Sequence, residues 1–110
     1  MANRTTTNPM FIDTWTANVT LAAKDTPIVI RKIVMFSAAA GDKFALDSGS
    51  SFDASKNPDK QIFMSTTVTN SHTHEVDFGD EGWRITEGVI IDVSDCTGYS
   101  SGDLVWIYLK

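Results

Sequence analysis

The 110-residue sequence has a single cysteine and no long apolar run. One cysteine cannot form an intramolecular disulfide, and no three partners stand at zinc-site spacing, so we interpret Cys96 as a small buried hydrophobe. No stretch approaches the roughly 18 apolar residues of a membrane helix, which argues against a membrane partner. The first nine residues lack the apolar segment of a signal peptide, so we expect a protein made in the cytoplasm and not secreted by that route.

Basic residues are also few. Nine lysines and arginines stand against 14 acidic residues, giving a net charge of -5 and a pI near 4.7. Such a chain repels a phosphate backbone, so we expect no nucleic-acid partner. The 42% hydrophobic and 21% charged residues are close to the average of folded proteins, which argues against a disordered chain. A chain of this length has room for one domain.

Motifs of phosphate binding and of a cysteine nucleophile are missing as well. Neither of the glycine-rich phosphate-binding motifs occurs, and no histidine stands near Cys96 in the sequence. We therefore predict no catalytic residue, no cofactor and no enzymatic activity.

What the chain does contain is β-type sequence. Alternating or β-branched segments recur between Gly, Asp, Asn and Ser turns, and no window of 11 or more residues has a helical period. This pattern predicts an all-β fold, a single antiparallel β-sandwich or barrel of jelly-roll type with seven to nine short strands. The segments expected as strands are 10–16, 17–23, 28–36, 43–47, 61–69, 72–78, 83–86, 88–93 and 104–109. The domain is expected to span 10–110, with a long loop at 48–60 and an extended N-terminal arm at 1–9.

Several of these strands have no polar face. In 104–109, Trp106 and Tyr108 share one face while Val105 and Ile107 share the other, and 28–36 is similar apart from Arg31 and Lys32. An antiparallel strand of a lone sandwich normally has one polar face. We therefore expect a neighbouring subunit to cover the second face, which makes the protein a homo-oligomer. The alternative is that a loop or the N-terminal arm covers it.

The arm at 1–9 is polar and has almost nothing to bury. Thr5, Thr6 and Thr7 favour an extended backbone that could add a strand to a sheet edge. We expect the arm to order on a partner and not on its own domain. The predicted assembly interface consists of Thr5, Thr6, Thr7, Trp106 and Tyr108.

Two polar groups deserve a test as metal ligands. Strand spacing puts His72 and His74 on one face, with Asp77 pointing the other way, so a metal would need a symmetry-related copy of the pair. The favoured interpretation is two exposed strand histidines without a metal. The acidic group Asp77, Asp80 and Glu81 lacks the spacing of a calcium-binding loop and is interpreted as a solvated turn.

Short strands and Gly-Asp turns recur in the polar arm and in four segments, Ile30-Arg31-Lys32-Ile33, Gly41 to Gly49, Trp83 to Val89 and Gly102 to Lys110. Their rhythm resembles that of small bacteriophage virion structural proteins, of the head decoration (cement) or tail accessory type. The resemblance implies a non-enzymatic β-sandwich that assembles symmetrically on a capsid or tail, with a trimer favoured, other virion proteins as partners and the virion as its location. The alternative is a carbohydrate- or ligand-binding β module that uses surface tryptophans and the 48–60 loop.

Overall fold

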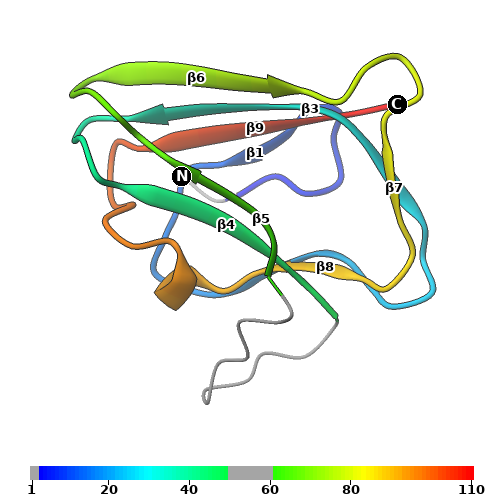
Figure 1. Ribbon diagram of the computed structural model, residues 1–110. Helices are drawn as coiled ribbons and strands as arrows, with labels where there is room; N and C mark the ends of the chain where they lie inside the picture. Colours follow the sequence, from blue (N-terminus) through cyan, green and yellow to red (C-terminus); the bar gives the residue numbers. More distant parts are fainter. Residues whose placement is uncertain (1–2, 50–60) are drawn as a thin grey trace.

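A computed structural model describes residues 3–49 and 61–110 and contains two antiparallel sheets. The five-stranded sheet has the order β1 (Met10–Ile12), β9 (Leu104–Leu109), β3 (Ile28–Ser37), β6 (His72–Asp77), and β7 (Trp83–Ile85) also pairs with β3. The four-stranded sheet has the order β2 (Val19–Ala22), β8 (Val89–Ile91), β4 (Lys43–Ser48), β5 (Gln61–Thr66). Figure 1 shows β6, β3, β9 and β1 side by side above β5, β4 and β8. The predicted all-β sandwich is confirmed, and the two sheets do not close into a barrel.

The core lies between the two sheets and follows from the alternation of the strands. On β3, Ile30, Ile33 and Met35 point inward and are at most 3% exposed. The pairing of β3 with β9 shifts register between Ile30 and Lys32, which marks a bulge with one extra residue on β3. After the bulge the buried positions fall on Ile33 and Met35. On β9, Val105 and Ile107 are fully buried. Burial of each such side chain stabilises the fold by about 1.5–3 kcal/mol.

An aromatic cluster and a buried carboxylate close one end of the sandwich. The rings of Trp15, Phe44 and Tyr99 lie 4.8–5.9 Å apart. The indole Nε1 of Trp15 donates to the carbonyl of Asp103 at 2.9 Å. The Asp103 carboxylate, which is 2% exposed, accepts from the backbone N–H groups of Ala38 and Ser100. These contacts fix the loops on both sides of the cluster.

Six strands are shorter than predicted, namely β1, β2, β5, β6, β7 and β8. In β1 and β8 the reason is that side chains take over backbone groups that a longer strand would use. The expected strand 10–16 ends at Ile12, since the side-chain oxygen of Asn3 accepts from the N–H groups of Asp13 and Thr14 at 2.9 Å each. The expected strand 88–93 ends at Ile91, since Asp92 caps the 3-10 turn η2 (Val93–Asp95). Of the predicted loop 48–60, Ser48 ends β4 and residues 50–60 lie outside the described part.

The arm contacts its own domain. Arg4 and Phe11 exchange two backbone hydrogen bonds of 2.8 Å, and the Asn8 side chain makes two with the backbone of Leu109. The edge of β1 is close enough in sequence for the chain to turn back onto it. The expectation that the arm cannot anchor itself on its own domain is therefore wrong for Arg4 and Asn8.

Within residues 3–49 and 61–110, we find no helix with the length and apolar character needed to cross a membrane.

Candidate functional site

The strongest candidate is the outer surface of the five-stranded sheet. Six apolar side chains from β1, β3 and β9 point away from the core there and are half-buried. We call this set the aromatic face: Phe11, Val34, Phe36, Leu104, Trp106 and Tyr108. A groove of about 460 Å³ runs over it, lined by five of these residues and by Thr73 of β6.

The strand register places one row of side chains straight across this face. Arg4 stands opposite Phe11, Phe11 opposite Trp106, and Trp106 opposite Val34. Val34 in turn stands opposite Glu75 of β6. The Phe11 and Trp106 rings are 5.5 Å apart, and the Arg4 guanidinium lies 5.1 Å from the centre of the Phe11 ring. An apolar row with Trp106 at its centre therefore has a cation at one end and an anion at the other.

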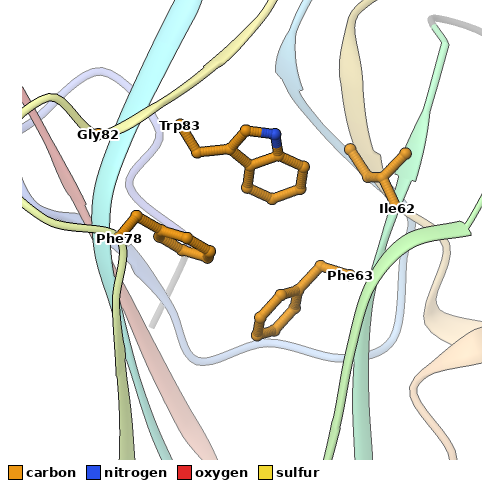
Figure 2. A pocket seen from close by; sticks show the side chains of 5 residues that line it. All are labelled: Ile62, Phe63, Phe78, Gly82 and Trp83. Atoms are coloured by element: carbon orange, nitrogen blue, oxygen red, sulfur yellow. The ribbon is translucent and has the colours of Figure 1, made fainter.

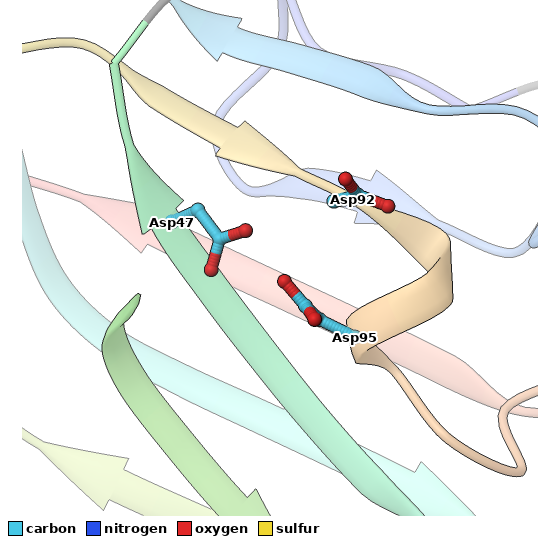
Figure 3. A group of neighbouring side chains, drawn as sticks. All are labelled: Asp47, Asp92 and Asp95. Atoms are coloured by element: carbon cyan, nitrogen blue, oxygen red, sulfur yellow. The ribbon is translucent and has the colours of Figure 1, made fainter. Parts of the chain in front are cut away.

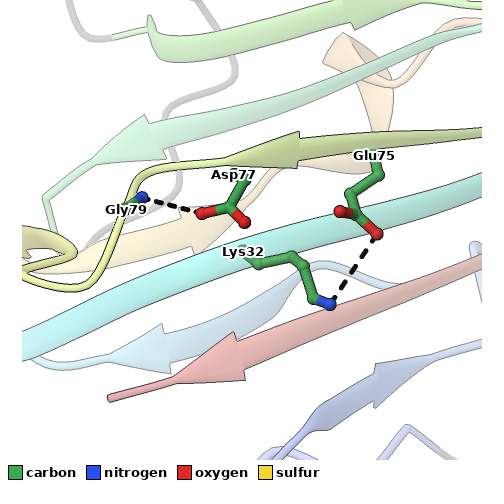
Figure 4. A network of polar contacts seen from close by, with 4 residues as sticks. All are labelled: Lys32, Glu75, Asp77 and Gly79. Atoms are coloured by element: carbon green, nitrogen blue, oxygen red, sulfur yellow. Dashed lines mark hydrogen bonds and ion pairs between the residues drawn. The ribbon is translucent and has the colours of Figure 1, made fainter.

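The β6 border of the aromatic face is charged. Lys32 Nζ lies 3.7 Å from Glu75 Oε1 and 4.9 Å from the centre of the Tyr108 ring. Asp77 Oδ1 accepts from the N–H of Gly79 at 2.7 Å. Figure 4 shows Lys32 on β3 reaching toward Glu75 on β6, with Asp77 farther along the same strand. A surface ion pair of this kind stabilises the fold by less than about 1 kcal/mol, so its interest is the charge that it places beside the aromatic groove.

The structure brings together part of the predicted interface. Trp106 and Tyr108 lie on the aromatic face, as their shared strand face predicted. Thr5, Thr6 and Thr7 follow Arg4 beyond the β1 border, and the Thr7 hydroxyl donates to the Pro9 carbonyl. The sequence prediction missed Arg4 and Phe11. Phe11 could have been found from its position between the inward residues Met10 and Ile12, whereas Arg4 enters the row only through a backbone bridge that no local pattern shows.

His72 and His74 lie on the same side of β6, with ring centres 6.4 Å apart. They stand opposite Ser37 and Met35, whereas Asp77 stands opposite Lys32 on the other side, as the strand spacing predicted. Among the residues that the structure describes, no further His, Cys, Asp or Glu joins the pair to form a group of three potential metal ligands. Metal binding by this pair stays a prediction that needs a second copy of the chain.

A carboxylate cluster that the sequence did not predict lies on the four-stranded sheet. Asp47 of β4, Asp92 after β8 and Asp95 of η2 bring ligand oxygens within 4.8 Å of one another. Figure 3 shows the three carboxylates converging from these elements. They could ligate a divalent cation, yet Ca²⁺ takes six to eight oxygens and Asp92 Oδ1 already accepts from Ser94. The cluster depends on the pairing of β4 with β8, which brings Asp47 beside Ile90.

Cys96 is 2% exposed, which confirms its interpretation as a buried hydrophobe. Burial raises the pKa of its thiol to about 12. A thiolate is the reactive form of cysteine, so this side chain is unreactive near neutral pH.

An aromatic pocket opens between β5 and the segment that leads into β7. It measures about 350 Å³ and is lined by Ile62, Phe63, Phe78, Gly82 and Trp83. Figure 2 shows Trp83 and Phe78 on one side facing Phe63 and Ile62 on the other. The Phe78 and Trp83 ring centres are 5.2 Å apart, and those of Phe63 and Phe78 are 6.2 Å apart. Trp83 thus lies in a pocket with three further apolar side chains, as the ligand-binding alternative requires of a surface tryptophan.

Comparisons with protein-family models, with curated proteins and with solved structures find no significant match to this chain.

Proposed function

We propose that this chain is a non-enzymatic structural protein of a bacteriophage virion, which assembles with further copies of itself through the aromatic face. The observation that carries the proposal is the aromatic face itself. It presents six apolar side chains on the surface of a sheet whose other surface already faces the core.

The chemistry of this face supports docking. An antiparallel sheet with one solvated surface alternates apolar and polar residues, yet β3 and β9 carry apolar residues on both surfaces. Contiguous apolar side chains rimmed by charges are typical of protein interfaces. Aromatic residues such as Trp106 and Tyr108 are also the types that most often dominate binding energy.

The virion is proposed from the resemblance of the strand rhythm and the Gly-Asp turns to small phage structural proteins. That resemblance favours three copies around an axis on a capsid or tail, with other virion proteins as neighbours. In such an assembly, Thr5, Thr6 and Thr7 would continue the interface beyond the β1 border.

The test is the mass of the purified chain in solution, measured by sedimentation from low to high micromolar concentration. We expect a multiple of 12.1 kDa at high concentration. Trp106→Arg should shift the species to a monomer, because it places a charge in the centre of the interface. Met64→Arg is the matched control, since Met64 is 55% exposed on the other sheet. Circular dichroism checks that each variant keeps its fold.

Two results would contradict self-assembly through this face. One is a monomer at every concentration. The other is an oligomer that Met64→Arg disrupts and Trp106→Arg leaves intact.

The ligand-binding alternative is favoured by one observation, the aromatic pocket around Trp83. Aromatic side chains that face a pocket can stack on a sugar ring or an apolar ligand. A titration of soluble oligosaccharides followed by tryptophan fluorescence tests this alternative. A saturable change that is lost in Trp83→Ala and kept in Trp106→Ala would favour it over assembly.

A further inference from the structure

We propose that two copies of the chain stack their aromatic faces about a two-fold axis parallel to the strands, with Arg4 of each copy against Glu75 of the other. This inference rests on the proposed function, because it requires the aromatic face to bind a second copy. It adds the orientation of the partner and the residues that select it, and it replaces the three copies that the resemblance alone favours with two.

The row across the sheet gives the orientation. From one border to the other it reads Arg4, Phe11, Trp106, Val34, Glu75, with one residue from each neighbouring strand. A two-fold axis that lies between two stacked sheets and runs along their strands exchanges the two borders. It therefore places the arm of one copy over β6 of the other.

This rotation lays the row of one copy over the same row of the second copy in reverse order. Trp106 is the middle residue, so it lies nearest the axis and faces the same residue of the second copy. Phe11 faces Val34 of the second copy, so an aromatic ring meets a smaller apolar side chain. Stacked sheets are about 10 Å apart, a spacing at which the side chains of the two faces interdigitate.

Charge selects this axis over the other two-fold arrangement. A two-fold axis perpendicular to the strands would keep each border over itself, with Arg4 near Arg4 and Glu75 near Glu75. Like charges in contact disfavour such a complex, whereas the parallel axis makes two identical pairs of opposite charge. Arg4 is exposed and the Glu75 side chain is 51% exposed, so both can reach a partner.

The charges around Glu75 keep this border acidic. Lys32 already pairs with Glu75 within the chain, but Asp77 lies on the same side of β6, opposite Lys32. Two carboxylates and one ammonium leave the β6 border negative at neutral pH. Arg4 of the second copy supplies the missing cation.

The experiment is a charge exchange on the full chain, with the dissociation constant measured by sedimentation. Arg4→Glu and Glu75→Arg should each raise the dissociation constant about tenfold or more, because each turns two attractive contacts into repulsive ones. The double variant Arg4→Glu, Glu75→Arg should return to within about threefold of the original value, since it restores both pairs with opposite sign.

Lys24→Glu and Glu87→Lys are the matched controls. Both residues are exposed in the segments that flank β2 and β8, away from the aromatic face. Neither change should move the dissociation constant by more than about twofold. Added salt should weaken the original dimer and have less effect on Arg4→Gln, because the attraction across the rim is screened.

The outcomes separate this pairing from the proposed function. Suppose that Trp106→Arg abolishes the oligomer but that the charge reversals leave the dissociation constant unchanged, or that the double variant does not recover the original value. The two-fold pairing is then wrong, while assembly through the aromatic face stands. An oligomer of three copies would lead to the same conclusion. If the original chain is a monomer throughout, the proposed function fails and the pairing fails with it.

Discussion

The outer surfaces of the two sheets differ in how far they are buried. On the four-stranded sheet, Ala45, Asp47 and Ile90 point away from the core strands, yet they are only 1%, 8% and 3% exposed, so the chain itself buries them. On the five-stranded sheet, the corresponding residues of β3 and β9 are aromatic or aliphatic and stay half-exposed. The chain itself buries one outer surface, whereas the other stays half-exposed and has the apolar composition that is typical of protein interfaces.

The buried outer surface contains the polar groups. Asp47, Asp92 and Asp95 converge there, whereas charges on the five-stranded sheet stand at its borders. Charged side chains are depleted from the centre of protein interfaces and enriched at the rim. The charge distribution therefore points to the same surface for docking as the apolar residues do.

The largest expected difference between the two outer surfaces is the loss of stability on replacing a buried residue of the four-stranded sheet, Ile90→Ala. We expect the free energy of unfolding to fall by about 2–5 kcal/mol, because the change leaves a cavity in a site that is already closed. Urea unfolding at low protein concentration measures it. A loss below about 1 kcal/mol would mean that this surface is open and that the contrast between the sheets is wrong.

Alkaline pH should weaken the same region. The Cys96 thiol has its pKa raised by burial from 9.0 to about 12, so above pH 9 the unfolded chain loses a proton that the native chain keeps. The stabilisation from this thiol is complete below pH 9 and is lost as the pH rises toward 12. Between pH 8 and pH 11 we expect the thiol alone to account for a loss of about 3 kcal/mol in the free energy of unfolding.

The control is Cys96→Ala, which removes this titration and leaves that of Tyr99, whose pKa burial also raises to about 12. Urea unfolding at both pH values should show a smaller loss in the variant. An equal loss in both proteins would mean that the thiol is not buried in solution.

The sequence predicted the strands of the aromatic face better than it predicted the sites. Period-two alternation is a local property, so 28–36 and 104–109 were found nearly to their ends. The ends at Ile12 and Ile91 depend on side chains that cap backbone groups, Asn3 from the arm and Asp92 from the next turn. Only the second of these caps is local in the sequence.

Features built from distant segments could not be predicted. The carboxylate cluster needs β4 to pair with β8, whose residues lie about forty positions apart, as Asp47 and Ile90 show. The row that begins at Arg4 needs four strand registers at once. Register between distant strands is set by the assembled core and not by the residues of one strand.

The smallest effect on stability should come from Val34→Ala on the aromatic face. We expect the monomer to lose less than about 1 kcal/mol, because the side chain is already partly in water. Self-association should nevertheless weaken by about three- to tenfold, as Val34 faces Phe11 of the second copy. Unfolding and sedimentation of the same sample separate these two effects. A monomer destabilised as strongly as in Ile90→Ala would show that the aromatic face is part of the fold's own core.

Hydroxyl-radical footprinting across a concentration series tests most directly which surface binds a second copy. As the protein passes from monomer to oligomer, oxidation of Trp106 and Tyr108 should fall, while oxidation of Met64 on the opposite sheet stays constant. Protection of Met64 with unchanged oxidation of Trp106 and Tyr108 would contradict the account.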